Sequence, residues 1–241
     1  MNLRTLFNEL SRAELSNLSM SNDGNGTISE ANIPKLVIYT NQGLLALYTR
    51  FQLAYNQLVL EMRAHITNYH IDSDYAESNQ DSCVPLEDRY IKDLCREHYI
   101  DDAIKLVSIY DHSNRYRTLN DDGDYLSIFT PQPLILQIPM PQERLPIFLT
   151  YQAMHKKLKY EGLTINQILN QRVKVPYFLH DALKNYIANK VFNHMGGQEN
   201  IIRSKELELN YEKICLDVED KDLINQTSSY THTKLEQKGF V

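Results

Sequence analysis

Residues 175–197 read VPYFLHDALKNYIANKVFNHMGG, and this stretch decides the fold. Its apolar residues recur every three or four positions, which places them on one face of an amphipathic helix. The predicted buried face consists of Phe178, Leu179, Ala182, Leu183, Tyr186, Ile187 and Val191. Pro176 suits the first turn, where a helix needs no backbone N–H. Gly196-Gly197 is a typical end of such a helix.

The following stretch, about residues 199–222, continues the helical period. Leu209, Leu216 and Leu223 lie seven residues apart, and other apolar residues accompany them in the predicted stripe. Those residues are Leu207, Tyr211, Ile214 and Val218. Because the glycine pair makes a short loop, we expect the two helices to form an antiparallel hairpin.

Two further helices are predicted at the N-terminus, over residues 2–15 and 29–52. The first presents Leu3, Leu6, Phe7 and Leu10 at helical spacing. The apolar stripe of the second consists of Ile33, Val37, Ile38, Leu44, Leu45, Tyr48 and Phe51, with Asn41 among them. These stripes are too wide to leave in water. We therefore expect residues 1–55 and 175–222 to form one helical bundle.

Residues 56–174 are predicted to be rich in β-structure. Leucines and Met62 alternate with other residues over 58–62, and an extended pattern continues over 66–71, so the two segments are predicted to form a hairpin. Further strands are expected at 103–110, 125–129, 134–138 and 145–154. Pro131 and Pro133 favour edge strands or strand ends.

Two segments interrupt this β-rich region, a polar insertion over residues 72–85 and a predicted short helix over 86–97. The order of elements is helices, then strands, then helices. The sequence therefore predicts an α+β fold, with a helical bundle from the N- and C-terminal helices and an intervening antiparallel β layer. Residues 223–241 are predicted to be a flexible tail because they contain few apolar residues.

The composition is that of an ordinary globular chain. It has 241 residues, a formal net charge of −6, 42% hydrophobic and 23% charged residues. The longest apolar run, residues 44–48, is far shorter than the ~20 residues that a bilayer requires, so no membrane contact is expected. The opening residues, MNLR, indicate neither secretion nor N-terminal lipidation. Sixteen tyrosines and no tryptophan favour an interaction surface.

Catalytic chemistry is not predicted. The three cysteines, at 83, 95 and 215, show no CxxC spacing and are expected to be reduced, with the second and third packed against helices. The eight histidines form no HExxH motif, and no GxSxG, GxGxxG or GxxxxGK[ST] motif occurs. The acidic clusters at 101–102 and 121–124 are typical of solvated turns, and the basic cluster at 155–159 is typical of a loop. We expect no enzyme, no catalytic residue and no cofactor.

A calcium-binding module is the alternative function. Residues 21–32 resemble an EF-hand loop, with Gly26 at the required sixth position and Asp23 and Asn25 at the third and fifth. However, Ser21 and Asn32 occupy the first and twelfth positions, where an acid and a bidentate glutamate are needed. A divalent cation would be held by one carboxylate, so a polar connection between helices is expected instead.

Three stretches together resemble head–tail adaptor (neck, or head-to-tail connector) proteins of tailed bacteriophages. The first is RTLFNELSRAELSNLSM followed by ISEANIPKLVIYTNQGLLALYTRF. The second is the β segment DDAIKLVSIYD with RTLNDDGDYLSIFTPQPLILQIPMPQERLPIFLTYQAMHKKL. The third is VKVPYFLHDALKNYIANKVFNHMGGQENIIRSKELELNYEKICLDVE. The resemblance covers about residues 4–222, and the insertion at 73–85 has no counterpart in it.

The resemblance implies a structural virion protein without catalytic residues. Such proteins are made in the host cytoplasm and assemble as a ring, usually of twelve subunits, at the head–tail junction of the virion. They join the portal protein to tail or nozzle proteins, and DNA passes through the channel without specific binding. In such families the helical bundle docks on the portal. The tail leaves this bundle, so its apolar residues Tyr230, Leu235, Phe240 and Val241 are candidate portal contacts.

Overall fold

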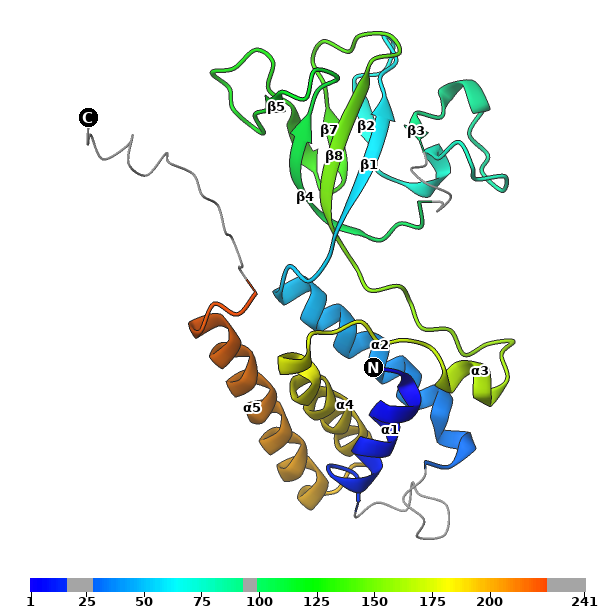
Figure 1. Cartoon of the computed structure of the whole chain (residues 1–241), viewed down its shortest axis with the longest axis vertical. Helices are drawn as coiled ribbons and strands as arrows, with labels where there is room; N and C mark the ends of the chain where they lie inside the picture. Colours follow the sequence, from blue (N-terminus) through cyan, green and yellow to red (C-terminus); the bar gives the residue numbers. More distant parts are fainter. Residues whose placement is uncertain (17–27, 93–98, 225–241) are drawn as a thin grey trace, which may run out of the picture. The chain divides into compact units, whose positions relative to one another are not determined.

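The computed structural model describes residues 1–16, 28–92 and 99–224, which form two compact units, Met1–Val175 and Pro176 onward. The fold is α+β, as predicted: along the chain, N-terminal helices are followed by antiparallel sheets and then by C-terminal helices (Figure 1). None of the described helices is both long and apolar enough to cross a membrane.

The first unit begins with α1 (Leu3–Arg12) and α2 (Ile33–Arg50). A 3₁₀ turn at Glu30–Asn32 leads directly into α2. The side chain of Asn2 caps α1 by accepting a hydrogen bond from the Thr5 N–H at 2.8 Å. The apolar face of α1 is buried, as its periodicity predicts, and consists of Leu3, Leu6, Phe7 and Leu10.

A third, short helix was not predicted. This helix, α3 (Ile165–Leu169), starts with a capping box in which the side chains and main chains of Thr164 and Gln167 exchange hydrogen bonds. Its single buried residue is Ile168. A helix of five residues is too short to produce a readable apolar period.

The larger sheet has five antiparallel strands in the order β3-β1-β8-β4-β5. The strands are β1 (Tyr55–Glu61), β3 (Ile91–Lys92), β4 (Ala103–Tyr110), β5 (Tyr116–Arg117) and β8 (Pro146–Ala153). Leu58, Leu149 and Ile109 pair across the three central strands and are buried together. This face of the sheet forms one side of the core.

The smaller sheet has three antiparallel strands in the order β2-β7-β6. They are β2 (Asn68–His70), β6 (Phe129–Gln132) and β7 (Ile135–Gln137). Residues of both sheets share one core, which includes Tyr69, Leu136, Leu60 and Ile147. Pro131 lies in β6, an edge strand, as its missing N–H favours.

The predicted hairpin between residues 58–62 and 66–71 is wrong. β1 pairs with β3 and β8, whereas β2 pairs with β7, so the two segments belong to different sheets. Between the two segments the chain passes from one sheet to the other. The Met62 N–H, just after β1, donates to Leu145 O at 2.9 Å, and Tyr69, in β2, is completely buried. Two sheets that face each other bury more apolar surface than one hairpin can.

Two other predictions in this region need correction. Residues 86–88 form only a 3₁₀ turn, and Ile91–Lys92 extend as β3 rather than a helix, because pairing with β1 buries Ile91. Residues 93–98 of the predicted helix lie outside the described part of the chain. Of the strand predicted at 125–129, Tyr125 and Leu126 form a turn, Ile128 makes an isolated bridge with Leu119, and the strand β6 starts at Phe129.

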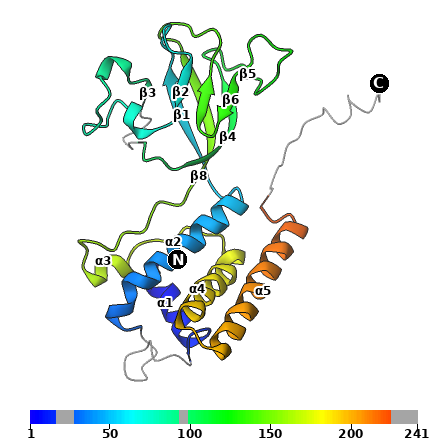
Figure 2. The ribbon, with the colours of Figure 1, turned by 180° about the vertical axis from the view of Figure 1, so that it is seen from behind.

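The second unit is the predicted helical hairpin. A 3₁₀ turn at Tyr177–Leu179 leads into α4 (His180–Met195), and α5 (Gln198–Asp220) packs along it (Figure 2). Gly196 and Gly197 join the helices with φ of 66° and 85°, values that L-residues with a Cβ rarely adopt. The buried residues of α4 are Ala182, Leu183, Ile187, Ala188, Val191 and Phe192.

The stripe predicted for α5 is wrong in part. Its buried residues are Ser204, Leu207, Tyr211, Cys215 and Val218, whereas Leu209, Leu216 and Leu223 are exposed. Two residues along a helix are about 200° of rotation, so Leu209 faces away from Leu207. Ile38 and Leu45 of α2, also predicted in a buried stripe, are exposed too. The union of residues 1–55 and 175–222 in one bundle stays a prediction.

Candidate functional site

The residues predicted from sequence to contact the portal, Tyr230, Leu235, Phe240 and Val241, lie outside the described residues. So does most of the EF-hand-like loop, of which residues 28–32 are described. At its last position, the Asn32 side chain donates to Ser29 Oγ at 2.9 Å, a contact within the turn that precedes α2. The described residues contain no group of three or more His, Cys, Asp or Glu that could hold a metal ion.

The acidic pairs serve as hydrogen-bond acceptors in turns. Asp101 accepts from the N–H of Ser73 at 2.6 Å, and Asp102 accepts from Tyr151 Oη at 2.8 Å. Asp121 and Asp124 accept from the main-chain N–H groups of Gly123 and Leu126, both at 2.9 Å. Each of these carboxylates therefore stabilises local backbone or a neighbouring side chain.

The basic cluster at 155–159 forms an irregular segment between β8 and α3. Leu158 in its middle is buried, and its N–H donates to Asn41 Oδ1 on α2 at 2.9 Å. His155 accepts a hydrogen bond at Nε2 from the Lys174 N–H at 2.9 Å. The segment is thus fixed to α2 and to the end of the first unit, and its lysines form no continuous basic helix face.

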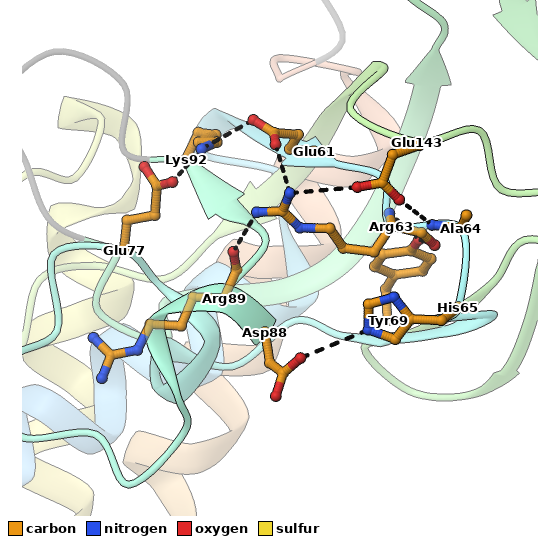
Figure 3. Close-up of polar contacts among 10 residues, drawn as sticks. All are labelled: Glu61, Arg63, Ala64, His65, Tyr69, Glu77, Asp88, Arg89, Lys92 and Glu143. Carbon is orange, nitrogen blue, oxygen red and sulfur yellow. Dashed lines mark hydrogen bonds and ion pairs between the residues drawn. The ribbon is translucent and has the colours of Figure 1, made fainter.

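A network of charged side chains lies beside the edge of the larger sheet (Figure 3). At its centre, Arg63 Nη1 lies 3.0 Å from Glu61 Oε1 and 3.8 Å from Glu143 Oε1. The other oxygen of Glu143 accepts from the Ala64 N–H at 2.7 Å. The main-chain N–H and C=O of Arg63 both bond the hydroxyl of Tyr69, at 2.9 and 3.0 Å. These contacts fix the turn that carries the chain from one sheet to the other.

Lys92 extends the network to the insertion at 72–85. Its ammonium lies 3.0 Å from Glu61 Oε2 and also bonds Glu77 (Figure 3). The hydrogen bond from Lys92 lowers the pKa of Glu61, although partial burial opposes this shift. Burial alone would lower the pKa of Lys92, but the two carboxylates together raise it. Both groups are therefore held in their charged forms.

Arg89 holds the insertion itself. The residue is almost fully buried, and its guanidinium donates to the main-chain carbonyls of Val84, Asn79 and Ser82. Its Nε lies 2.9 Å from Val84 O and Nη2 lies 3.2 Å from Ser82 O. A guanidinium presents donors in a rigid planar fork, so one side chain can fix three loop carbonyls. The insertion is thus ordered by a residue that follows it.

This network stabilises the fold. Glu61, Lys92 and Arg63 neutralise one another, and no nucleophile lies next to a base within the network. Sequence reasoning missed it because its members come from residues 61 to 143, and because three of the partners of Arg89 are backbone carbonyls. Every residue has a backbone carbonyl, so the sequence does not show which carbonyls accept a hydrogen bond from Arg89.

Helices α5 and α2 each expose large apolar side chains on one face. On α5, Ile202, Leu209 and Leu216 are 54%, 70% and 51% exposed and lie seven residues apart. On α2, Ile38 and Leu45 are 39% and 48% exposed, also seven residues apart. Exposed apolar side chains that share one helix face indicate an interaction surface more than scattered ones do.

The outer face of the larger sheet carries an aromatic row. Phe148, Tyr110 and Tyr116 follow one another in register across β8, β4 and β5. The rings of Tyr110 and Tyr116 lie edge to face with centroids 5.9 Å apart, and Phe148 and Tyr116 are exposed. Aromatic residues are enriched at protein–protein contacts, so this row is a second candidate interaction surface.

Comparison with known proteins finds no family model that matches this chain and no curated protein that matches it in sequence.

Proposed function

We propose that this chain is a structural virion protein, a head–tail adaptor of a tailed bacteriophage. Its subunits form a ring, of twelve copies as is usual in that family, that joins the portal to the tail proteins at the head–tail junction. DNA passes through the ring without specific binding. The proposal rests on the resemblance of three stretches of the chain to this class and on the α+β fold with its C-terminal helical hairpin.

The observation that carries the proposal is the second apolar face of α5. One face, with Leu207, Tyr211 and Val218, is buried, and the opposite face exposes Leu209 and Leu216. A helix with two apolar faces needs a second partner to cover the outer one. A subunit of a larger assembly has such a partner in its neighbour.

The calcium-binding alternative gains no support from the described residues. Asn32, at the position that needs a bidentate glutamate, bonds Ser29 instead.

We propose that the tail, with Tyr230, Leu235, Phe240 and Val241, adds a portal contact. A chain that lacks residues 225–241 should then keep its melting temperature and lose binding to the portal. Full binding of the truncated chain would refute the role of the tail alone.

The experiment for the main proposal is co-expression of the full chain with the portal protein of the same phage. We expect the two proteins to purify together, and electron microscopy to show a ring of this chain on one face of the portal. As a control, the portal protein is co-expressed with an unrelated acidic protein of similar size, and the amount that purifies with the portal is compared. Separate elution of the two proteins would contradict the proposal.

A further inference from the structure

The outer face of α5 is a regular stripe that extends beyond the helix end. Ile202, Leu209 and Leu216 are followed at the same spacing by Leu223, which is also exposed. A seven-residue repeat keeps apolar side chains on one side of a helix that packs at a small angle against another helix. From Ile202 to Leu216 the stripe is therefore shaped to contact a second helix along about four turns.

The outer face of α2 has the same repeat. Ile38 and Leu45 are separated by seven residues, and Gln42 and Thr49 are exposed with them at helical spacing. Lys35, one turn before Ile38, lies on the same side of the helix. Among the described helices, α2 and α5 are the two that expose large apolar residues with this repeat.

The charges of the two helices are complementary. The α5 segment Gln198–Asp220 contains seven acidic and three basic residues, a net charge of −4. The α2 segment Ile33–Arg50 contains Lys35 and Arg50 and no acidic residue, a net charge of +2. Opposite charge favours contact between α5 and α2, while pairing of α5 with a second α5 would bring like charges together.

We propose that the α5 stripe of one copy docks on the outer face of α2 of a neighbouring copy. This inference rests on the proposed ring. A ring of more than two subunits needs two different complementary surfaces on each copy, because only a head-to-tail contact repeats around the ring. The occupant of the stripe is thus a second copy of this chain, and the partner surface on α2 is centred on Ile38 and Leu45, with Lys35 beside it.

The proposed contact is small. Three or four apolar side chains on the α5 stripe and two on α2 cover much less than the ~1,200 Å² that stable complexes bury. A single contact is therefore weak, and many contacts closed into a ring, or held on a common portal, give a stable assembly. Free subunits should accordingly be largely monomeric and should associate when they are concentrated on a common surface.

Cross-linking between two singly substituted full-length chains tests the contact. One chain carries Leu45→Cys and the other Leu209→Cys, both with Cys83→Ser and Cys95→Ser, and one has a tag that changes its size. A short bis-maleimide linker should trap a mixed dimer of the two chains. The matched control replaces Leu209→Cys by Asn210→Cys, which is also exposed but turned about 100° around the helix.

We expect several-fold more mixed dimer with Leu209→Cys than with Asn210→Cys. Equal yields, or homodimers of the Leu209→Cys chain in place of mixed ones, would overturn the proposal. A double variant with both cysteines in one chain is the second control: if it links within a single chain, α5 contacts its own α2 and the proposal fails.

A second experiment separates this inference from the proposed function. Leu209→Gln with Leu216→Gln should leave the melting temperature nearly unchanged and lower the number of copies on each portal several-fold. The control, Glu208→Gln, should keep the full number. If the double variant fills the portal normally, the docking proposal is refuted while the proposed adaptor function stands. If the unmodified chain does not bind the portal, the proposed adaptor function itself is refuted.

Discussion

The buried side chain of Gln152 on β8 donates a hydrogen bond to the main-chain oxygen of Tyr48, near the end of α2, at 2.5 Å. The same amide lies 3.3 Å from Phe51 O. One side chain of the larger sheet thus satisfies carbonyls at the end of a helix 104 residues earlier in the chain. Helix ends leave their last carbonyls without partners, so this contact replaces a missing cap.

Replacing this amide should destabilise the first unit. Gln152→Leu removes the donor and leaves a buried carbonyl unsatisfied, which costs about 1–3 kcal/mol. Urea unfolding of the variant measures the loss. Gln57→Leu, an exposed glutamine on the same face of the sheet, is the control and should change the free energy of unfolding by less than about 0.5 kcal/mol. Equal effects of the two variants would mean that the Tyr48 contact is not structural.

Arg89 should be required for the order of the insertion. Arg89→Met keeps most of the apolar volume but removes the donors to Val84, Asn79 and Ser82. We expect a loss of stability of roughly 1–3 kcal/mol and faster proteolysis within residues 73–85. Arg115→Met, at an exposed position, should leave the cleavage rate unchanged. An insertion equally resistant in both variants would contradict the role assigned to Arg89.

His155 should make the first unit less stable in mild acid. Burial lowers the pKa of His155, and its Nε2 can accept from the Lys174 N–H only while the ring is neutral. Since the folded state has the lower pKa, this contribution is present above the unfolded value of about 6.5 and is lost as the pH falls below it.

The test compares unfolding at pH 7 and pH 5. The difference in stability between these values should be smaller in His155→Gln, which keeps a side chain able to accept from Lys174. His112→Gln, at an exposed position, should retain the pH dependence of the unmodified chain. An unchanged pH dependence in His155→Gln would show that another group is responsible.

The two faces of the C-terminal hairpin should respond differently to truncation. Leu183 of α4 is completely buried, so Leu183→Ala should cost about 2–5 kcal/mol. Leu209→Ala removes the same atoms from an exposed side chain and should change stability by less than about 0.5 kcal/mol. Thermal unfolding of both variants measures this. A large loss from Leu209→Ala would mean that the outer face of α5 is covered within the chain.

The helices were predictable because their period is local. The Leu183 face of α4, the glycine pair and the hairpin follow from residues within about fifty positions. The choice of buried face on α5 failed because the leucines at 209 and 216 are more apolar than Ser204 and Cys215, which contact the inside. Apolar content alone cannot decide between two faces that both carry apolar residues.

The sheets and the charged network were harder to predict because their contacts are long-range. β2 pairs with β7, so Tyr69 finds its cross-strand partner at Leu136 rather than in the adjacent β1. Arg63 and Glu143 meet only because the two sheets bring their loops together. Alternation in sequence identifies a strand, but not its neighbour.

Immunogold labelling of purified virions is the most direct test of the adaptor function. The antibody is raised against this chain and applied to particles of the phage that encodes it, with and without mild disruption of the tail. We predict label at the single vertex where head and tail meet, retained on the portal vertex after the tail is removed. Label spread over the capsid, label at the distal tail tip, or its absence from purified particles would contradict the account.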